Sequence, residues 1–288
     1  MKTFNTLSVL LACLISMPAH AQPTKDTKAN VADVKTPQSK HTHHAKPTWE
    51  LGVAAGAVTL PHYMGSDQRY YAGLATPYFM YRGQHFQFDR QGLRTSLFKD
   101  GKLQVKANIS FGLPVSNNNL ARQNMPSLRL SGEAGPQLIW NFRQRGVSRM
   151  GIHLPWRAAF NIRGKYLGWV AEPTLQMAWY GLGQKRQYGV HIKAGLLFAS
   201  QQYQQHYYGV APIYATVNRP AYEAQQGLHS LVLSSRFMYR YDEDIDVALF
   251  MRARHLKFGR NKDSPLVKQP FYFGVGIGLT WKLWSSGW

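Results

Sequence analysis

The sequence predicts an all-β protein, an antiparallel transmembrane β-barrel of about twelve strands with short periplasmic turns and longer outer loops. Three observations lead to this fold class: long runs of alternating apolar and polar residues, an N-terminal export signal, and a basic composition rich in aromatic residues. The alternation is clearest from Leu103 to Val115, where every second residue is apolar. Successive side chains leave opposite faces of a strand, so this period indicates a sheet with two different faces.

The same pattern returns from Ile152 to Ile162, from Tyr188 to Phe198 and from Phe271 to Leu283. Each run is about ten residues or longer, the length that a tilted strand needs to cross a hydrocarbon layer. Strands of soluble proteins average about five or six residues. The lengths of these runs therefore favour strands that cross a membrane over strands of a soluble protein.

The N-terminus predicts export. Lys2 precedes an apolar stretch, Leu7 to Met17, which is followed by the cleavage pattern Ala19-His20-Ala21. Residues 1–21 are therefore expected to be a signal peptide, and the mature protein to reach the cell outer membrane through the periplasm. Cys13 is the only cysteine and would leave with the signal, which excludes disulfides and thiolate sites.

Residues 22–48 contain five lysines and three prolines, with no usable period. We expect a disordered, basic periplasmic arm here, followed by the barrel over 49–288. Within the arm, His41-Thr42-His43-His44 fits either a transition-metal site or a polar linker that is rich in histidine. We favour the linker and expect no metal and no cofactor.

The composition also agrees with a barrel. Aromatic residues make up 13% of the chain although its mean hydropathy is −0.34, as expected when one face of each strand meets lipid and aromatic girdles lie at both interfaces. The net charge is +20. Such a charge often indicates nucleic acid, which an exported chain does not meet. We expect instead outer-membrane lipid and lipopolysaccharide, with murein and murein-processing enzymes as candidate partners.

Turn residues bound the individual strands. The predicted strands are 49–60, 72–82, 84–90, 92–99, 102–115, 129–142, 150–162, 168–180, 187–200, 228–241, 245–257 and 270–283. A break at Gln91-Gly92 gives an even number of strands and places the long connections 61–71, 116–128, 201–227 and 258–269 outside. Ten strands remain the alternative.

Three short motifs, in order, resemble those of the MipA/OmpV family (MltA-interacting protein, outer membrane protein V). They are Pro61-His62-Tyr63-Met64-Gly65-Ser66, Tyr207-Tyr208-Gly209-Val210 and Asp263-Ser264-Pro265-Leu266-Val267. The resemblance covers roughly 49–283. Gly278-Leu279-Thr280-Trp281-Lys282-Leu283 also has the form of a terminal strand read by the outer-membrane assembly machinery. The basic arm and the Trp-Ser-Ser-Gly-Trp tail depart from the family.

The resemblance implies a barrel that acts as a scaffold linking a lytic transglycosylase to a murein synthase. Other members are described as adhesion, osmotic-response or antibiotic-binding proteins. The family carries no catalytic residues. Ser234-Ser235 has no histidine nearby in register, and His153 and His191 have no obvious serine or carboxylate partner. We therefore expect a protein without enzymatic activity.

The alternation assigns a basic inner face to the barrel, with Glu133, Glu172 and Asp246 as its acids. The candidate lumen residues are Lys102, Lys106, Arg157, Lys193, Arg236, Arg240, Arg252 and Arg254. They would form either a small anion-preferring channel or a filled interior in which the charges pair, because about twelve strands lie between the filled and the open barrel sizes.

Loop 201–227 places aromatic side chains among glutamines. Its candidate binding residues are Tyr203, Tyr207, Tyr208 and Tyr214. Such a mixture suits sugars or a protein partner, as in a surface adhesin or ligand-binding barrel. Alternatively, the same tyrosines continue an aromatic girdle into a lid.

Overall fold

The strands show two contrasting faces, as the alternation predicts. Along the last strand, Tyr272, Gly274, Gly276, Gly278 and Thr280 are buried, whereas the large apolar residues between them are mostly exposed. Apolar side chains thus cover the outside of the sheet, which is the arrangement of a barrel in lipid rather than of a soluble protein.

The computed structural model describes residues 49–82, 86–89, 92–100, 102–115 and 118–286. The predicted signal peptide, the arm with its histidines and the terminal Trp288 lie outside these residues and stay predictions. The predicted break at Gln91-Gly92 is confirmed, because the strands on its two sides pair antiparallel, with Asp89 opposite Gly92. Within the described chain, no helix is both long and apolar enough to cross a bilayer.

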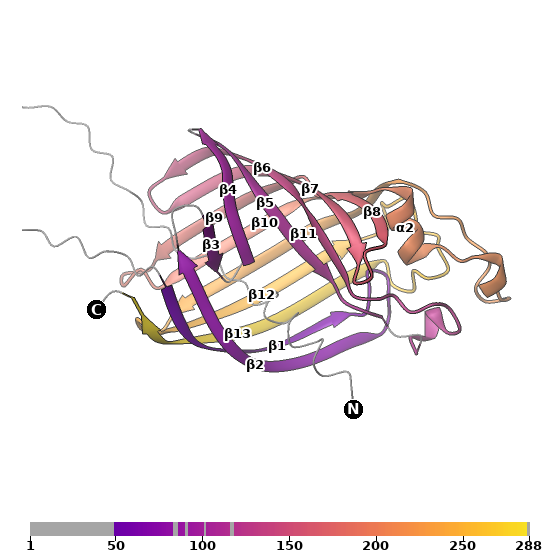
Figure 1. Cartoon of the computed structure of the whole chain (residues 1–288), viewed down its shortest axis with the longest axis horizontal. Helices are drawn as coiled ribbons and strands as arrows, with labels where there is room; N and C mark the ends of the chain where they lie inside the picture. Colours follow the sequence, from indigo (N-terminus) through magenta and orange to yellow (C-terminus); the bar gives the residue numbers. More distant parts are fainter. Residues whose placement is uncertain (1–48, 83–85, 90–91, 101, 116–117, 287–288) are drawn as a thin grey trace, which may run out of the picture.

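Strands dominate the described chain (Figure 1). They are β1 (Trp49–Pro61), β2 (Arg69–Arg82), β3 (Phe86–Asp89), β4 (Gly92–Asp100), β5 (Leu103–Gly112), β6 (Ser131–Arg145), β7 (Ser148–Asn161), β8 (Tyr166–Ala171), β9 (Thr174–Leu182), β10 (Tyr188–Ala199), β11 (Gly227–Arg240), β12 (Ile245–His255) and β13 (Phe271–Ser285). The helical pieces are α2 (Gln201–Tyr208), η1 (Leu120–Arg122) and η2 (Pro212–Tyr214).

The sheet is antiparallel and closes on itself. Each strand pairs with its neighbours in sequence, except that β8 and β9 both pair with β7 and β10 and not with each other. β1 pairs with β13, for example at Ala57↔Ile277, which joins the first and the last strand. A closed sheet leaves no unpaired edge for lipid to meet. The prediction of an antiparallel transmembrane β-barrel is confirmed.

The strand count differs from the predicted twelve. The structure assigns thirteen strands to the described residues, because the segment predicted as one strand over 168–180 is divided into β8 and β9. Both pieces pair with β7 on one side and β10 on the other, so they continue each other in a single position of the barrel. Glu172 and Pro173 form the interruption, since proline cannot donate to a ladder.

Long and short connections lie at opposite ends. The described parts of the four long predicted connections are at one end, together with α2, and the short turns are at the other, near residues 49 and 286 (Figure 1). We call these the outer and the periplasmic end, following the orientation of bacterial barrels.

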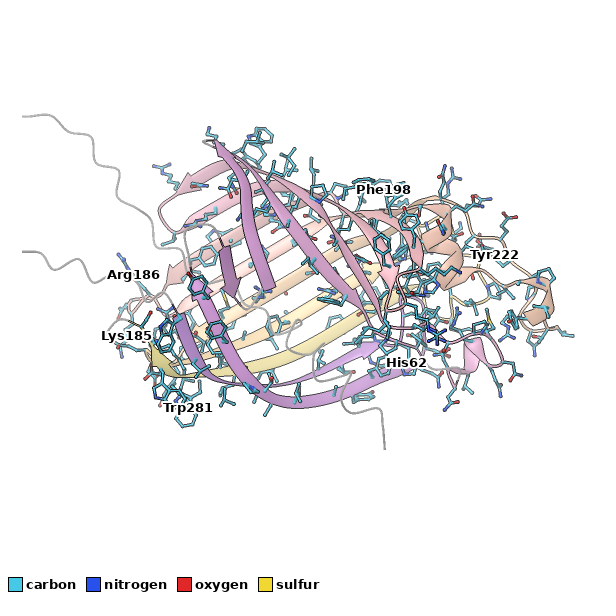
Figure 2. All side chains as sticks on the ribbon, viewed as in Figure 1. His62, Lys185, Arg186, Phe198, Tyr222 and Trp281 are labelled. Carbon is cyan, nitrogen blue, oxygen red and sulfur yellow. The ribbon has the colours of Figure 1, made fainter. Side chains whose placement is uncertain are left out.

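Exposed aromatic side chains form bands near both ends, as expected for membrane interfaces. The periplasmic band contains Trp49, Tyr81, Trp140, Tyr188, Trp281 and Trp284, and the outer band contains Tyr71, Phe111, Phe160, Tyr166 and Phe271. Figure 2 shows Trp281 at the periplasmic end and Tyr222 at the outer end. The two bands mark the ends of the surface that faces lipid.

A Cβ on Gly135 of β6 would collide with the backbone carbonyl oxygen of Trp156 in the neighbouring strand β7. We expect Gly135→Ala to lower the free energy of unfolding by about 1–3 kcal/mol, because backbone has to shift. Gly132→Ala on the same strand is the control, since its Cβ would meet only the Phe111 ring at 3.9 Å. Urea unfolding in detergent measures both; equal midpoints would contradict the prediction.

Candidate functional site: a basic interior beneath an outer lid

Four segments pack together at the outer end and form a lid. We define the outer lid as residues 62–68, 118–130, 200–226 and 256–270. Tyr63 Oη donates to the carbonyl oxygen of Leu266 at 2.7 Å, and Tyr208 Oη donates to that of Met64 at 2.8 Å. Ser264 Oγ in turn donates to the carbonyl oxygen of Tyr208 at 2.8 Å. Three of the four segments are thereby joined in a cycle.

The segment 118–130 is held by arginines. Arg122 Nη1 donates to the carbonyl oxygen of Tyr207 at 3.0 Å, and Arg219 Nη1 donates to that of Gln123 at 2.8 Å. Two buried apolar clusters fill the space between the segments: Tyr63, Val115, Leu128, Tyr208, Ala224 and Leu256 form one, and Ala121, Met125, Val210 and Leu266 form the other. Residues from different loops thus share one interior, which makes the lid a packed structure.

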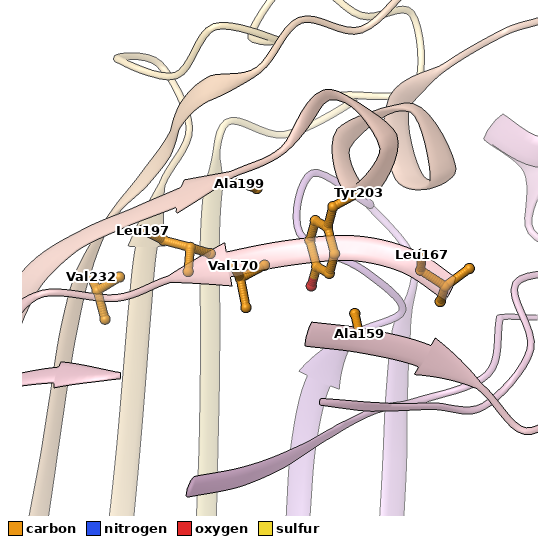
Figure 3. Close-up of a cluster of buried hydrophobic side chains, with 7 residues drawn as sticks. All are labelled: Ala159, Leu167, Val170, Leu197, Ala199, Tyr203 and Val232. Atoms are coloured by element: carbon orange, nitrogen blue, oxygen red, sulfur yellow. The ribbon is translucent and has the colours of Figure 1, made fainter. Parts of the chain in front are cut away.

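Helix α2 lies in the lid above the barrel wall. Ser200 caps the helix by accepting from the backbone N–H of Tyr203 at 3.3 Å. Tyr203 points from α2 into the apolar cluster with Val170 and Ala159 (Figure 3). Its hydroxyl donates to Glu133 Oε1 at 3.0 Å, so the helix is tied to the wall strand β6.

The candidate tyrosines of this loop do not form the predicted outward-facing surface. Tyr203 and Tyr208 are 5% and 1% exposed, and Tyr207 packs against the same clusters. Tyr214 lies in η2, where its carbonyl oxygen accepts from Arg219. The lid interpretation therefore describes Tyr203, Tyr207 and Tyr208, and binding of a sugar or a protein partner by this loop stays a prediction.

Burial also fixes the protonation of lid side chains. It raises the pKa of the Tyr203 and Tyr208 hydroxyls well above the usual value, so both remain hydrogen-bond donors. Burial lowers the pKa of His206 to about 4, and the charges of Arg122 and Lys165 act in the same direction. At neutral pH His206 is therefore uncharged and requires no counter-ion in the lid.

Below the lid, charged side chains from both sides of the interior meet in what we call the ionic layer: Glu133, Arg157, Glu172, Lys193 and Arg254. Glu172 projects from the interruption between β8 and β9 and is almost fully buried. It accepts from Lys193 Nζ of β10 and, at 3.1 Å, from Arg254 Nη2 of β12. Arg157 Nε of β7 donates to Glu133 Oε2 at 2.9 Å, and its Nη2 lies 3.9 Å from Glu172.

The structure places seven of the eight predicted lumen residues in three groups. Arg157, Lys193 and Arg254 belong to the ionic layer, and Lys106, Arg236 and Arg252 also lie on the inner face. Arg240 pairs with Asp246 at 3.5 Å near the periplasmic end. Lys102 corrects the prediction, because it lies in the turn before β5 with its side chain exposed. The sequence pattern missed the role of Tyr203, since no period connects a loop tyrosine to Glu133.

Two inner histidines have amide partners. His191 Nε2 lies 3.1 Å from Gln176 Oε1, and His153 Nδ1 lies 3.1 Å from Gln137 Nε2. Within the described residues, no three histidines, cysteines or acids gather as a metal site would require. The interior thus presents a charged, hydrogen-bonded layer and a set of cations, an arrangement suited to holding or repelling ions.

Glu172→Gln should lower the free energy of unfolding by about 3–5 kcal/mol, because it leaves buried Lys193 and Arg254 without their counter-charge. Asp246→Asn is the matched control: it breaks the partly exposed pair with Arg240 and should cost less than about 1 kcal/mol. Unfolding by guanidinium in detergent compares the two. Equal losses would show that Glu172 is not the central counter-charge.

Replacing residues 201–226 by a short Gly-Ser linker should raise the conductance of the barrel in planar bilayers and favour anions, because it removes most of the lid above a basic interior. A replacement limited to residues 212–218, whose Ile213 and Val217 are 84% and 99% exposed, should leave the conductance of the wild type unchanged. If the larger replacement also leaves it unchanged, the lid does not control passage.

Comparisons with solved structures found several outer-membrane proteins similar to this chain. The chain is similar to an outer membrane channel from Pseudomonas putida F1, with 8% identity over 86% of this chain and 100% of the other and a TM-score of 0.45. It is also similar to OmpT of Vibrio cholerae, with 8% identity over 83% of this chain and 99% of the other and a TM-score of 0.35. The outer membrane channel DcaP of Acinetobacter baumannii is 10% identical over 82% of this chain and 97% of the other, with a TM-score of 0.34. These likenesses concern the fold alone.

The comparison with curated proteins gave no match. A family model described as MltA-interacting protein MipA, however, matches residues 53–283, which run from the first strand to the last. The matched range contains the barrel, the ionic layer and the outer lid. The chain therefore belongs to the MipA family of MltA-interacting proteins.

Proposed function

We propose that this outer-membrane barrel is a scaffold that holds murein-processing enzymes, a lytic transglycosylase and a murein synthase, at the periplasmic side of the membrane. The family match carries the proposal, because its description names an interaction with a protein, MltA, and no transported solute. The outer lid also supports the proposal. Its four segments pack together across the outer end of the barrel, which is expected for a membrane anchor rather than for an open pore.

The periplasmic end offers a surface for such partners. Arg143 and Arg145 are in the last residues of β6, beside the turn to β7, and Lys185 and Arg186 lie in the turn between β9 and β10; we call these four exposed residues the basic rim. The two turns are neighbours, because Tyr180 N donates to the carbonyl oxygen of Val147 at 3.0 Å. Figure 2 shows Lys185 and Arg186 together at this end.

The basic rim keeps its charge available. Among the described residues, none of its four members forms an ion pair. The nearby acids are used locally: Asp242 accepts from the backbone of its own turn, and Asp244 lies 3.5 Å from Lys282. An uncompensated basic rim would attract an acidic enzyme surface or the carboxylates of murein over a long range.

We expect the combined change Arg145→Glu, Lys185→Glu and Arg186→Glu to reduce the recovery of murein enzymes several-fold after crosslinking in intact envelopes. The matched control reverses three exposed lysines of the lid, Lys257, Lys262 and Lys268, and should leave recovery unchanged. Deleting residues 22–47, the predicted basic arm, should also weaken recovery while the barrel still assembles.

The outcomes separate the alternatives. Loss of murein enzymes from the rim variant but not from the lid control supports the scaffold. Equal recovery from all variants would refute a role of the basic rim, and capture of surface components by way of the lid would favour an adhesin. A conducting wild-type barrel would favour the anion-preferring channel.

A further inference from the structure

A cavity of about 190 Å³ lies inside the barrel, where β10, β11, β12, β13 and β1 meet. Its polar lining includes His191, Lys193, Ser234, Arg236 and Arg252. The proposed scaffold function does not use this cavity. We call it the inner cavity.

Strand register explains why these side chains meet. His191 of β10 is opposite Arg236 of β11, which is opposite Phe250 of β12. The next inward-facing row lies two positions closer to the outer end. In that row Lys193 of β10 is opposite Ser234 of β11, which is opposite Arg252 of β12. Residues two apart on a strand share a face, so both rows point into the barrel. The next row outward contains Arg254, so the inner cavity lies on the periplasmic side of the ionic layer.

The charge in these rows is not balanced. Lys193 pairs with Glu172, but within the described part of the chain neither Arg236 nor Arg252 pairs with a carboxylate. Arg236 Nε and Ser234 Oγ are buried and have no hydrogen-bond partner. Buried donors without acceptors are costly, and a buried guanidinium group without a counter-charge more so. Arg252, which is more exposed, adds a second positive charge to the same cavity. The site is therefore complementary to a group that brings negative charge and acceptor oxygens.

The remaining lining is apolar and recessed. The Phe250 ring lies 5.2 Å below the Arg236 guanidinium, and Val58 and Leu60 of β1 complete one side. On β13 the residues opposite Arg252 and Phe250 are Gly274 and Gly276, which place no side chain in the cavity. A flat or compact apolar body fits this half of the site.

We propose that the inner cavity binds a small organic oxyanion, a carboxylate or phosphate group on a compact apolar body. Arg236 and Arg252 hold the oxyanion, and Phe250 with the glycine floor accommodates the body. The ligand enters from the periplasmic end, because the ionic layer and the outer lid occupy the other side. This inference does not depend on the scaffold function.

Calorimetry on the detergent-solubilised full barrel tests the proposal, with benzoate and phenyl phosphate as probes and benzamide as the uncharged counterpart of benzoate. We expect binding of at least one anionic probe and none of benzamide. Arg236→Gln and Arg252→Gln should each weaken anion binding by about tenfold or more, because a charged hydrogen bond is lost. Arg240→Gln, which removes an equal charge from the same strand outside the cavity, should leave binding unchanged.

A second variant fills the cavity and keeps both arginines. A Cβ on Gly274 would meet Leu60 at 3.4 Å, an ordinary contact, so Gly274→Leu is expected to fold and to abolish binding. Heat-modifiable migration in electrophoresis checks folding of every variant. The anionic probe that binds with the higher affinity shows whether the site prefers a carboxylate or a phosphate group. The proposal is overturned if neither anion binds more tightly than benzamide, or if Arg252→Gln and Gly274→Leu bind as the wild type does.

Discussion

The carboxylate of Glu172 is the counter-charge on which the interior of this barrel depends. Three cations from different strands lie within 4 Å of it or donate to it, and two of them, Arg157 and Arg254, are almost fully buried. A basic inner face without this carboxylate would leave buried charges that cost several kcal/mol each. Because the ionic layer can form, the lid can pack above it and a cavity can remain below it.

The position of Glu172 follows from a defect in a strand. Pro173 cannot donate to the ladder, so the strand divides into β8 and β9, and Glu172 N and the Pro173 carbonyl oxygen bond on opposite sides to Pro155 and Leu196. Few ladder hydrogen bonds are lost at this division, because β8 and β9 both remain paired with β7 and β10. The carboxylate lies in the interior among three cations, two from the flanking strands β7 and β10 and one from β12.

Period-two alternation was enough to predict the fold, because lipid contact imposes it on every spanning strand. It also identified Arg236, Arg252 and Arg254 as inner residues. It did not predict the break at Glu172-Pro173, since a single proline interrupts the alternation without changing its phase. Lys102 was assigned inward because its neighbours continue the alternation, although the turn had already begun. The burial of Tyr203 and Tyr208 depends on contacts between distant loops, which no local pattern contains.

The bonds that hold the outer lid together differ in what they require of the sequence. Tyr63, Tyr208, Arg122 and Arg219 donate to backbone carbonyl oxygens of other segments, which every residue type supplies. The donors are therefore constrained, whereas the acceptor positions can change identity without loss of the bond. A surface that faces the environment can in this way accumulate substitutions, and escape recognition by antibodies or phages, while the lid beneath it stays assembled.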